Sequence, residues 1–303
     1  MNSRLETEDD QGRDAAIEAA RAAYDRMADR NDPLCRVAKD DQIEQPLSAV
    51  DASGWLGDDI RGKRLLCLAA GGGRQSAIYA TAGAEVTVVD ISPAMLELDR
   101  ISAAARGYSV RLVETSMDRL TMFAAEEFDI VVQPVSTCYL PTVIPVFSEV
   151  ARVLRPGGLY VSQHKSPTSL QTSERPDRDG YAIRRPYYTA GPLPPADRRD
   201  SVTRRIREAG AQEYVHRWEQ LVGGMCRCGF VIEDLVEPDH HDAHAAIGTF
   251  AHRANYVAPY VRIKARRLGD RVSRGGDQNR LWLPGDSDGS TTRNDGPDPK
   301  TRR

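Results

Sequence analysis

The chain has 303 residues, a length that suits either two domains or one α/β domain with insertions. Hydrophobic residues make up 40% of it, and 41 basic residues against 44 acidic ones leave a net charge of −3. This is the composition of a globular protein. Proteins that bind nucleic acid usually carry an excess of basic residues, and this chain has none, so nucleic acid is disfavoured as its main partner. No run approaches the ~18 apolar residues of a membrane span, and the polar, acidic start lacks a signal-peptide core. We therefore predict a cytoplasmic protein.

The N-terminal part of the chain is predicted to be mostly helical. Residues 1–13 are polar and are expected to be disordered. An apolar stripe from Asp14 to about Ala28 predicts a helix, and a shorter helix is expected over 47–56. We expect residues 14–60 to form a helical cap on the domain that follows.

The central part of the chain alternates between short apolar runs and amphipathic stretches. This alternation predicts strands buried on both faces, joined by helices that cover a mostly parallel sheet on both sides. Strands are predicted over 65–70, 85–90, 110–114, 128–132 and 159–162, and helices over 75–82, 92–106 and 143–154.

Residues 165–215 interrupt this alternation and are rich in proline, arginine and tyrosine. A segment of this length without a regular pattern is typical of a lid or binding insertion, or of a disordered segment with solvated side chains; we expect it to cap the substrate. Tyr187 and Tyr188 are candidates to cover a flat apolar substrate, and His216 directly after the insertion is a further candidate for substrate contact.

Regular patterns return after the insertion. A helix is predicted over 216–228, and strands over 230–236 and 256–264. Pro259 interrupts the last strand and places it at an edge or a bulge. Residues 269–303 are polar and are expected to be a disordered tail. One domain over residues 14–268 is therefore predicted.

The most informative segment is the first predicted strand with the turn that follows it. The strand ends in Gly71-Gly72-Gly73, where a ligand can approach the backbone without meeting a Cβ atom. In an open α/β sheet, ligands bind beyond the carboxyl ends of the strands. Asp90 ends the second strand, where a carboxylate can accept hydrogen bonds from ribose hydroxyls. Together they predict a nucleotide-like ligand.

Four segments in this order resemble motifs of class I S-adenosylmethionine (SAM)-dependent methyltransferases. They are the glycine turn at 65–76, the second strand and helix start at 86–96, the fourth strand at 128–132, and the turn at 150–159. The resemblance implies a Rossmann-like fold with a seven-stranded, mostly parallel sheet, and SAM as cofactor. It also implies a set of cofactor-binding residues: Ala69, Gly71, Gly73, Asp90, Ile91, Met95, Ser116, Met117 and Gln133.

The sequence departs from the family pattern at three positions. Cys67 and Ala69 stand where the family usually has an acid and a glycine. Family members often carry an acid after the third strand that meets the adenine amine, and the matching residue here is Ser116. Met117 is then expected to pack on the adenine ring, with Asp118 as an alternative partner for the amine.

Candidate residues for the acceptor side follow the fourth and fifth strands. The loop 133–139 lacks the Asn/Asp-Pro-Pro-aromatic motif of many methyltransferases that act on amino groups of nucleic acids or proteins, which favours a small-molecule acceptor. Tyr139 is a candidate to orient the acceptor, with packing as the alternative. His164 is the candidate general base, because neutral imidazole accepts a proton near pH 7; a hydrogen-bonded loop histidine is the alternative.

The sequence also bears on three alternative functions. A non-catalytic SAM-binding protein is favoured by the altered first motif. A nicotinamide-dependent oxidoreductase is disfavoured, because its glycine motif needs glycine or alanine where Ser76 stands. The segment 240–244 holds three histidines and an aspartate, but it lies in a polar loop without a second cluster, so no metal is expected. No pattern specifies the acceptor atom or an oligomeric state.

Overall fold

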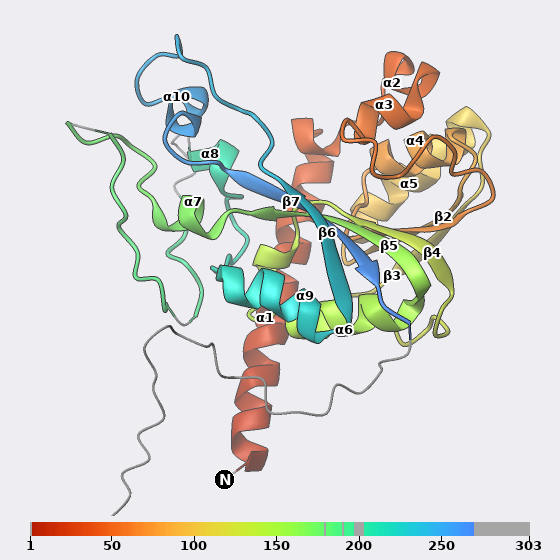
Figure 1. Cartoon of the computed structure of the whole chain (residues 1–303), viewed down its shortest axis with the longest axis horizontal. Coiled ribbons are helices and arrows are strands. Elements are labelled where there is room, and N and C mark those ends of the chain that lie inside the picture. Colours follow the sequence, from red (N-terminus) through yellow and green to blue (C-terminus); the bar gives the residue numbers. More distant parts are fainter. Residues whose placement is uncertain (1, 179, 190, 197–202, 270–303) are drawn as a thin grey trace, which may run out of the picture. The chain divides into compact units, whose positions relative to one another are not determined.

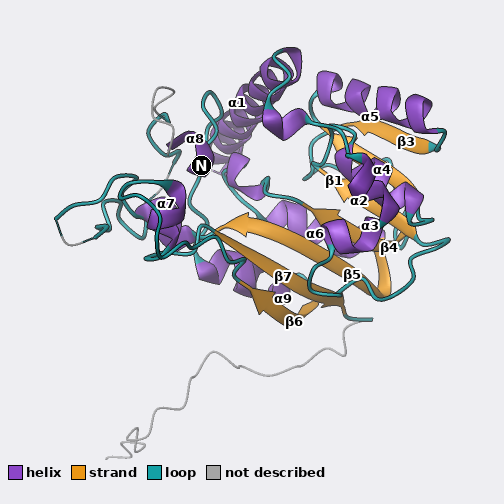
Figure 2. Ribbon diagram, turned by 90° about the horizontal axis from the view of Figure 1, so that it is seen from above, coloured by secondary structure: helices purple, strands orange, loops and turns teal. Residues whose placement is uncertain are grey.

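The apolar runs of the sequence form a seven-stranded sheet in the order β3-β2-β1-β4-β5-β7-β6 (Figures 1 and 2). The structure, a computed structural model, describes residues 2–178, 180–189, 191–196 and 203–269. The strands are β1 Arg64–Leu68, β2 Glu85–Asp90, β3 Val110–Glu114, β4 Phe128–Gln133, β5 Leu154–Lys165, β6 Phe230–Val236 and β7 Tyr260–Arg267. The helices and helical turns are α1 Asn2–Asp29, η1 Pro33–Cys35, α2 Asp40–Glu44, α3 Pro46–Val50, α4 Arg74–Thr81, α5 Pro93–Arg106, η2 Thr137–Tyr139, α6 Ile144–Val153, α7 Pro167–Gln171, α8 Thr203–Ile206, η3 Glu219–Gly223, α9 Gly224–Arg227 and α10 Phe250–Ala254.

The sheet is parallel except for one strand. β1 lies between β2 and β4, with Leu65 opposite both Val86 and Ile130. β7 runs antiparallel between β5 and β6. The predicted fold, a seven-stranded and mostly parallel sheet, is confirmed. Because β1, β2 and β4 run in one direction, their carboxyl ends meet at a single edge of the sheet.

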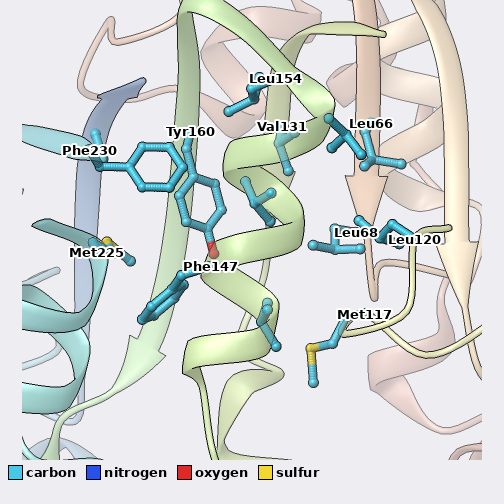
Figure 3. Packing of buried hydrophobic residues seen from close by; sticks show 14 of the residues in the cluster. Leu66, Leu68, Met117, Leu120, Val131, Phe147, Leu154, Tyr160, Met225 and Phe230 are labelled. Carbon is cyan, nitrogen blue, oxygen red and sulfur yellow. The ribbon is translucent and has the colours of Figure 1, made fainter. Parts of the chain in front are cut away.

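Each face of the sheet is covered by its own hydrophobic core. On one face, Leu66 and Leu68 of β1 belong to a cluster with Phe147 of α6, Tyr160 of β5 and Phe230 of β6. In Figure 3 these three rings lie close together, with centroids 6.4 Å apart for Phe147 and Tyr160 and 5.5 Å apart for Tyr160 and Phe230. The opposite face packs against α3 and α4. Because successive side chains of β1 are buried in the cores on opposite faces, its sequence is a continuous apolar run.

Helix α5 begins and ends where the sequence predicts. Ser92 caps α5 by accepting a hydrogen bond from the Met95 backbone N–H at 3.1 Å, and Pro93 occupies the first turn. Gly107 ends α5 in the left-handed conformation, with φ of +73°. These local signals hold α5 in a defined position beside the glycine turn.

Several boundaries differ from the predictions. The helix predicted over 47–56 is the shorter α3, which ends at Val50. α1 begins at Asn2 instead of Asp14, because no proline interrupts the segment and extending a helix costs less than starting one. β5 begins at Leu154, ahead of the predicted residue 159, because a register shift opposite β4 accommodates the Pro-Gly-Gly turn. Pro259 precedes β7 and does not interrupt it. The predicted tail lies beyond residue 269, outside the described residues.

The segment between β5 and η3 is held by α10 at its start and by β5 at its end. At its start, the buried Arg253 of α10 donates from Nε to the Ser173 carbonyl at 2.9 Å and from Nη1 to Ser169 Oγ at 2.8 Å. At its end, the Lys165 ammonium of β5 hydrogen-bonds to Glu213. These contacts bring the segment back to the carboxyl edge of the sheet.

Candidate cofactor and acceptor site

A cavity of about 510 Å³ lies at the carboxyl ends of β1, β2, β4 and β5. The turn after β1 lines one part of it, and the loop after β4 lines another. Ile17, Ala20 and Tyr24 of α1 contribute to its wall, as does Glu208 from the segment after β5. The cavity volume is in the usual range for a small-molecule site.

Two carboxylates hold the glycine turn. Asp90 Oδ2 accepts a hydrogen bond from the Gly71 N–H at 2.9 Å, and Asp99 Oδ2 accepts one from the Gly72 N–H at 2.9 Å. Gly73 starts α4 with φ of +76°, a conformation that favours glycine. The turn thus presents its backbone to the cavity while carboxylates fix it from behind.

Asp90 has the position that a ligand-binding carboxylate at a strand end requires. It lines the cavity and is 8% exposed, and its Oδ1 also accepts a hydrogen bond from the Ser92 N–H at 2.9 Å. Burial raises its pKa, although these backbone N–H groups oppose the shift. Each carboxylate oxygen retains a further lone pair for a ligand hydroxyl.

The structure brings most of the predicted cofactor residues to this one cavity. Ala69, Gly71, Asp90, Ile91, Met95, Ser116, Met117 and Gln133 all line it. Gly73 does not: it lies beneath the turn and packs against α5. Asp118 also points away, because its carboxylate binds the Arg13 guanidinium at 2.5 Å and accepts a hydrogen bond from Ser116 Oγ. Asp118 is therefore engaged with α1 and does not line the cavity.

The far end of the cavity holds a hydrogen-bonded network. Tyr24 of α1 donates to Tyr139 Oη at 3.0 Å, and Tyr139 hydrogen-bonds in turn to the Glu208 carboxylate. All three side chains line the cavity. Of these residues, the sequence analysis singled out only Tyr139. No local pattern marks the other two, since they come from α1 and from the irregular segment after β5.

The network continues into a buried ion cluster. Lys165 is 2% exposed and its ammonium binds both Glu208 and Glu213, while Arg207 binds the second Glu213 oxygen at 2.5 Å. Burial alone would raise the pKa of Glu208, but the Lys165 ammonium outweighs it and holds the pKa below its usual value. Two basic and two acidic groups thus share the cluster; burial raises the pKa of Glu213 against the opposing Lys165 and Arg207 charges, whereas Glu208 remains ionised.

The two predicted histidines do not line the cavity. His164 is 1% exposed, and both ring nitrogens are engaged at 2.8 Å, with Thr137 Oγ1 and with Ser162 Oγ. Burial lowers its pKa to about 3. His216 hydrogen-bonds to the Thr137 carbonyl at 3.0 Å, and burial lowers its pKa to about 4. The expectation that His164 acts as base is corrected, because the imidazole is buried within hydrogen bonds away from the cavity.

The remaining candidate residues of the acceptor side differ in their exposure and contacts. Tyr187 and Tyr188 are 41% and 78% exposed and lie outside the cavity lining, so the structure does not bring them to a substrate. His240 does line the cavity, with its ring against Phe250 and Tyr260. Among the described residues, no group of three or more His, Cys, Asp or Glu side chains is placed to hold a metal ion.

Comparisons with known proteins agree with this geometry. Residues 66–162 match the family model described as a methyltransferase domain. The chain is 34% identical over 183 residues to the uncharacterized methyltransferase YbaJ of Bacillus subtilis, an alignment that covers 59% of this chain and 69% of that protein. The chain belongs to the class I SAM-dependent methyltransferases. Its cofactor is SAM, as the motifs predicted.

Two further relatives extend the comparison. A SAM-dependent methyltransferase from Mesorhizobium loti shares the fold of this methyltransferase, with a TM-score of 0.58 and 22% identity over 74% of this chain and 100% of that one. A rice protein named 24-methylenesterol C-methyltransferase 2 is 35% identical over 118 residues, which cover 38% of this chain and 32% of the rice protein.

In the part of the chain that the structure describes, no helix is long and apolar enough to cross a membrane.

The residues around the cavity of this methyltransferase fit SAM. Gln75 Oε1 is buried and has no hydrogen-bond partner among the described residues, so a ligand N–H can satisfy it. Gly72 has φ of +116°, a backbone conformation that favours glycine, and a Cβ atom on it would point toward the Met95 methyl at 2.9 Å. The wall also holds the Asp90 carboxylate for hydroxyl groups and apolar surface from Ile91 and Met117 for a ring.

Proposed function

We propose that this methyltransferase transfers the methyl group of SAM to a small-molecule acceptor that binds in the same cavity. The observation that carries the proposal is the continuity of this cavity, which runs from the glycine turn to the Tyr139 and Glu208 side chains. A wall contributed by α1 limits the space to a small ligand. The name of the rice relative, which specifies a sterol acceptor, is consistent with an acceptor of this class.

The cofactor end of the cavity is assigned from the chemistry of its walls. We assign the ribose hydroxyls to Asp90, and the adenine ring to the apolar surface of Ile91 and Met117. The unsatisfied Gln75 Oε1 suits the ammonium group of the amino acid end. Arg74 lines the same end, and among the described residues its guanidinium Nε donates to the neutral Gln42 side chain at 3.4 Å, so it is placed to bind a carboxylate.

The protein orients the reactants, excludes water from them and provides a proton acceptor. SAM supplies a methyl group already activated by its sulfonium. The cavity walls hold the acceptor in line with that methyl group and exclude water, and such orientation supplies a large share of the acceleration. The ionised Glu208 accepts a proton from an acceptor hydroxyl or ammonium, directly or through Tyr139. This assigns to Glu208 the role that the sequence suggested for His164.

Binding and turnover measurements test the proposed function. S-adenosylhomocysteine (SAH) should bind in isothermal titration calorimetry, and labelled methyl groups should pass from SAM to small molecules of a metabolite extract, with none passing to nucleic acid. An absence of SAH binding would contradict the proposal. SAH binding without transfer to any fraction of the extract would favour the alternative, a non-catalytic SAM-binding protein, which the unusual Cys67 and Ala69 motivate.

Asp90→Ala is expected to weaken SAH binding by about 1–3 kcal/mol, because the ribose loses buried hydrogen bonds to a charged group. Titration calorimetry of the variant measures the loss. The control is Asp40→Ala, which removes a carboxylate that is 91% exposed and bonded only to Arg106 in a surface ion pair. Equal affinities of the wild type and Asp90→Ala would reject the ribose assignment.

Glu208→Gln is expected to lower kcat/KM by about 100-fold or more while the affinity for SAH stays unchanged, because a neutral amide does not accept the acceptor's proton. The measurement is steady-state methyl transfer to the acceptor found in the extract. Glu219→Gln is the matched control, since this glutamate is 58% exposed and bonds to surface arginines. Full activity in Glu208→Gln would remove it from the reaction.

A further inference from the structure

The carboxylate of Asp99 lies behind the glycine turn and outside the cavity. Asp99 belongs to α5 and is 0% exposed. Its Oδ2 accepts the Gly72 N–H at 2.9 Å, and its Oδ1 accepts the hydroxyl of Ser76, near the start of α4. This buried aspartate therefore connects α5 to the glycine turn and to the start of α4.

Among the described residues no arginine or lysine forms an ion pair with Asp99, so backbone and hydroxyl groups alone stabilise its charge. Three titratable groups surround it: the buried Cys67 thiol of β1, the Asp90 carboxylate at the end of β2, and the Tyr108 hydroxyl, which lies 3.2 Å from Ser76 Oγ. None of them is a cation. An ionised Asp99 is therefore costly for the fold.

The position of Cys67 explains why an acid is needed here. Cys67 stands on β1 where related methyltransferases usually carry an acid, and its side chain is fully buried. The Asp99 carboxylate lies close enough to raise the pKa of this thiol further, after the larger effect of burial. In this chain the negative charge next to the turn therefore comes from Asp99 on α5, while β1 carries the Cys67 thiol.

We infer that Asp99 is a positioning residue for SAM: its ionised carboxylate holds the Gly72 N–H and so keeps the glycine turn in the conformation that receives the cofactor. This inference rests on the proposed function. Asp99 touches no ligand itself, since it does not line the cavity. The ionised Asp99 favours cofactor binding but lowers the stability of the folded protein. An ordinary core residue, in contrast, stabilises the fold.

The direction of that loss follows from linkage. Burial raises the pKa of Asp99 to about 6, against the opposing hydrogen bonds from Ser76 and Gly72. A folded-state pKa above the unfolded value means that protonated Asp99 stabilises the fold fully below about pH 4. This contribution is lost as the pH rises through about 6. Above that pH the protein carries the charge that the turn requires.

Asp99→Asn tests the inference, because the amide retains the shape and can still accept the Gly72 N–H while the charge is removed. At pH 8 we expect SAH to bind about tenfold or more weakly, as a charged hydrogen bond becomes a neutral one. We expect the Tm of the ligand-free variant to equal or exceed that of the wild type. Glu97→Gln on the exposed face of α5 is the control and should change neither quantity.

A double variant tests whether the charge can be returned to the strand. Cys67→Asp/Asp99→Ala should recover SAH binding relative to Asp99→Ala alone. Wild-type affinity for SAH should also decrease below about pH 6, while that of Asp99→Asn should depend less on pH.

Two outcomes would overturn the assignment of Asp99: SAH binding by Asp99→Asn with wild-type affinity, or weaker binding together with a lower Tm, which is what a merely structural residue would give. Lack of SAH binding by the wild type would instead contradict the proposed function. In that case the Gly72 amide resonance of the ligand-free protein still decides the inference, since it should shift with pH as Asp99 ionises and should not shift in Asp99→Asn.

Discussion

Lys165→Met is expected to lower the free energy of unfolding by about 3–5 kcal/mol, because it leaves two buried carboxylates without their shared cation. The Lys165 ammonium binds both Glu208 and Glu213, and these side chains are 15% and 0% exposed. Arg207 still binds Glu213, but Glu208 retains only hydrogen bonds such as that from Tyr139. Urea unfolding at pH 8 measures the loss.

The control and the pH dependence separate this effect from a general sensitivity to the loss of lysine. Lys264→Met removes an ammonium 3.4 Å from Glu233 in a partly exposed pair, and it should cost at most about 1 kcal/mol. In Lys165→Met the two carboxylates raise each other's pKa, so the folded state takes up a proton and the variant should regain stability as the pH is lowered from 8 to 5. A cost equal to that of Lys264→Met would show that the cluster is not buried in solution.

Gly73→Ala is expected to destabilise the protein by about 2–4 kcal/mol and to abolish measurable SAH binding. The backbone at Gly73 has φ of +76°, which costs an L-residue about 1–2 kcal/mol. A Cβ atom here would also lie 2.8 Å from the Leu98 carbonyl and 3.0 Å from Ser102 Cβ, so α5 must move. That movement displaces Asp99, which holds the turn.

Gly107→Ala provides the matched control for Gly73→Ala. Gly107 has almost the same φ, +73°, but no atom lies within 4 Å of a Cβ placed there. It should therefore show only the conformational cost and leave SAH affinity unchanged. Thermal unfolding and titration calorimetry on both variants give the comparison. Similar losses of stability and binding in the two variants would show that close packing against α5 does not matter for the turn.

Much of the fold could be predicted because its signals are local. The strand β1 reads as an apolar run since it is buried on both faces, and Ser92-Pro93 and Gly107 mark the two ends of α5 in the sequence. The predicted cofactor residues follow strand ends, and parallel strands bring their carboxyl ends to one edge. Asp90 and Met117 therefore reach the same cavity although they lie on different strands and loops.

The acceptor end required the tertiary structure. Tyr24, Tyr139 and Glu208 come from α1, the loop after β4 and the segment after β5, and no periodicity connects them. His164 illustrates the reverse case: its place after a strand suggested a base, but only the fold shows that Thr137 and Ser162 occupy both ring nitrogens.

The sequence by itself determined the sheet, the two ends of α5 and most of the predicted residues that line the cavity, because hydrophobic periodicity, caps and glycine turns act over a few neighbouring residues. Only the tertiary structure decided the surroundings of the acids near the cavity. Asp99 reaches the Gly72 N–H from α5, and the environment of Glu208 depends on Lys165, far from it in the sequence. Burial and charge pairing set the chemistry of a carboxyl group, and both arise from contacts between distant parts of the chain.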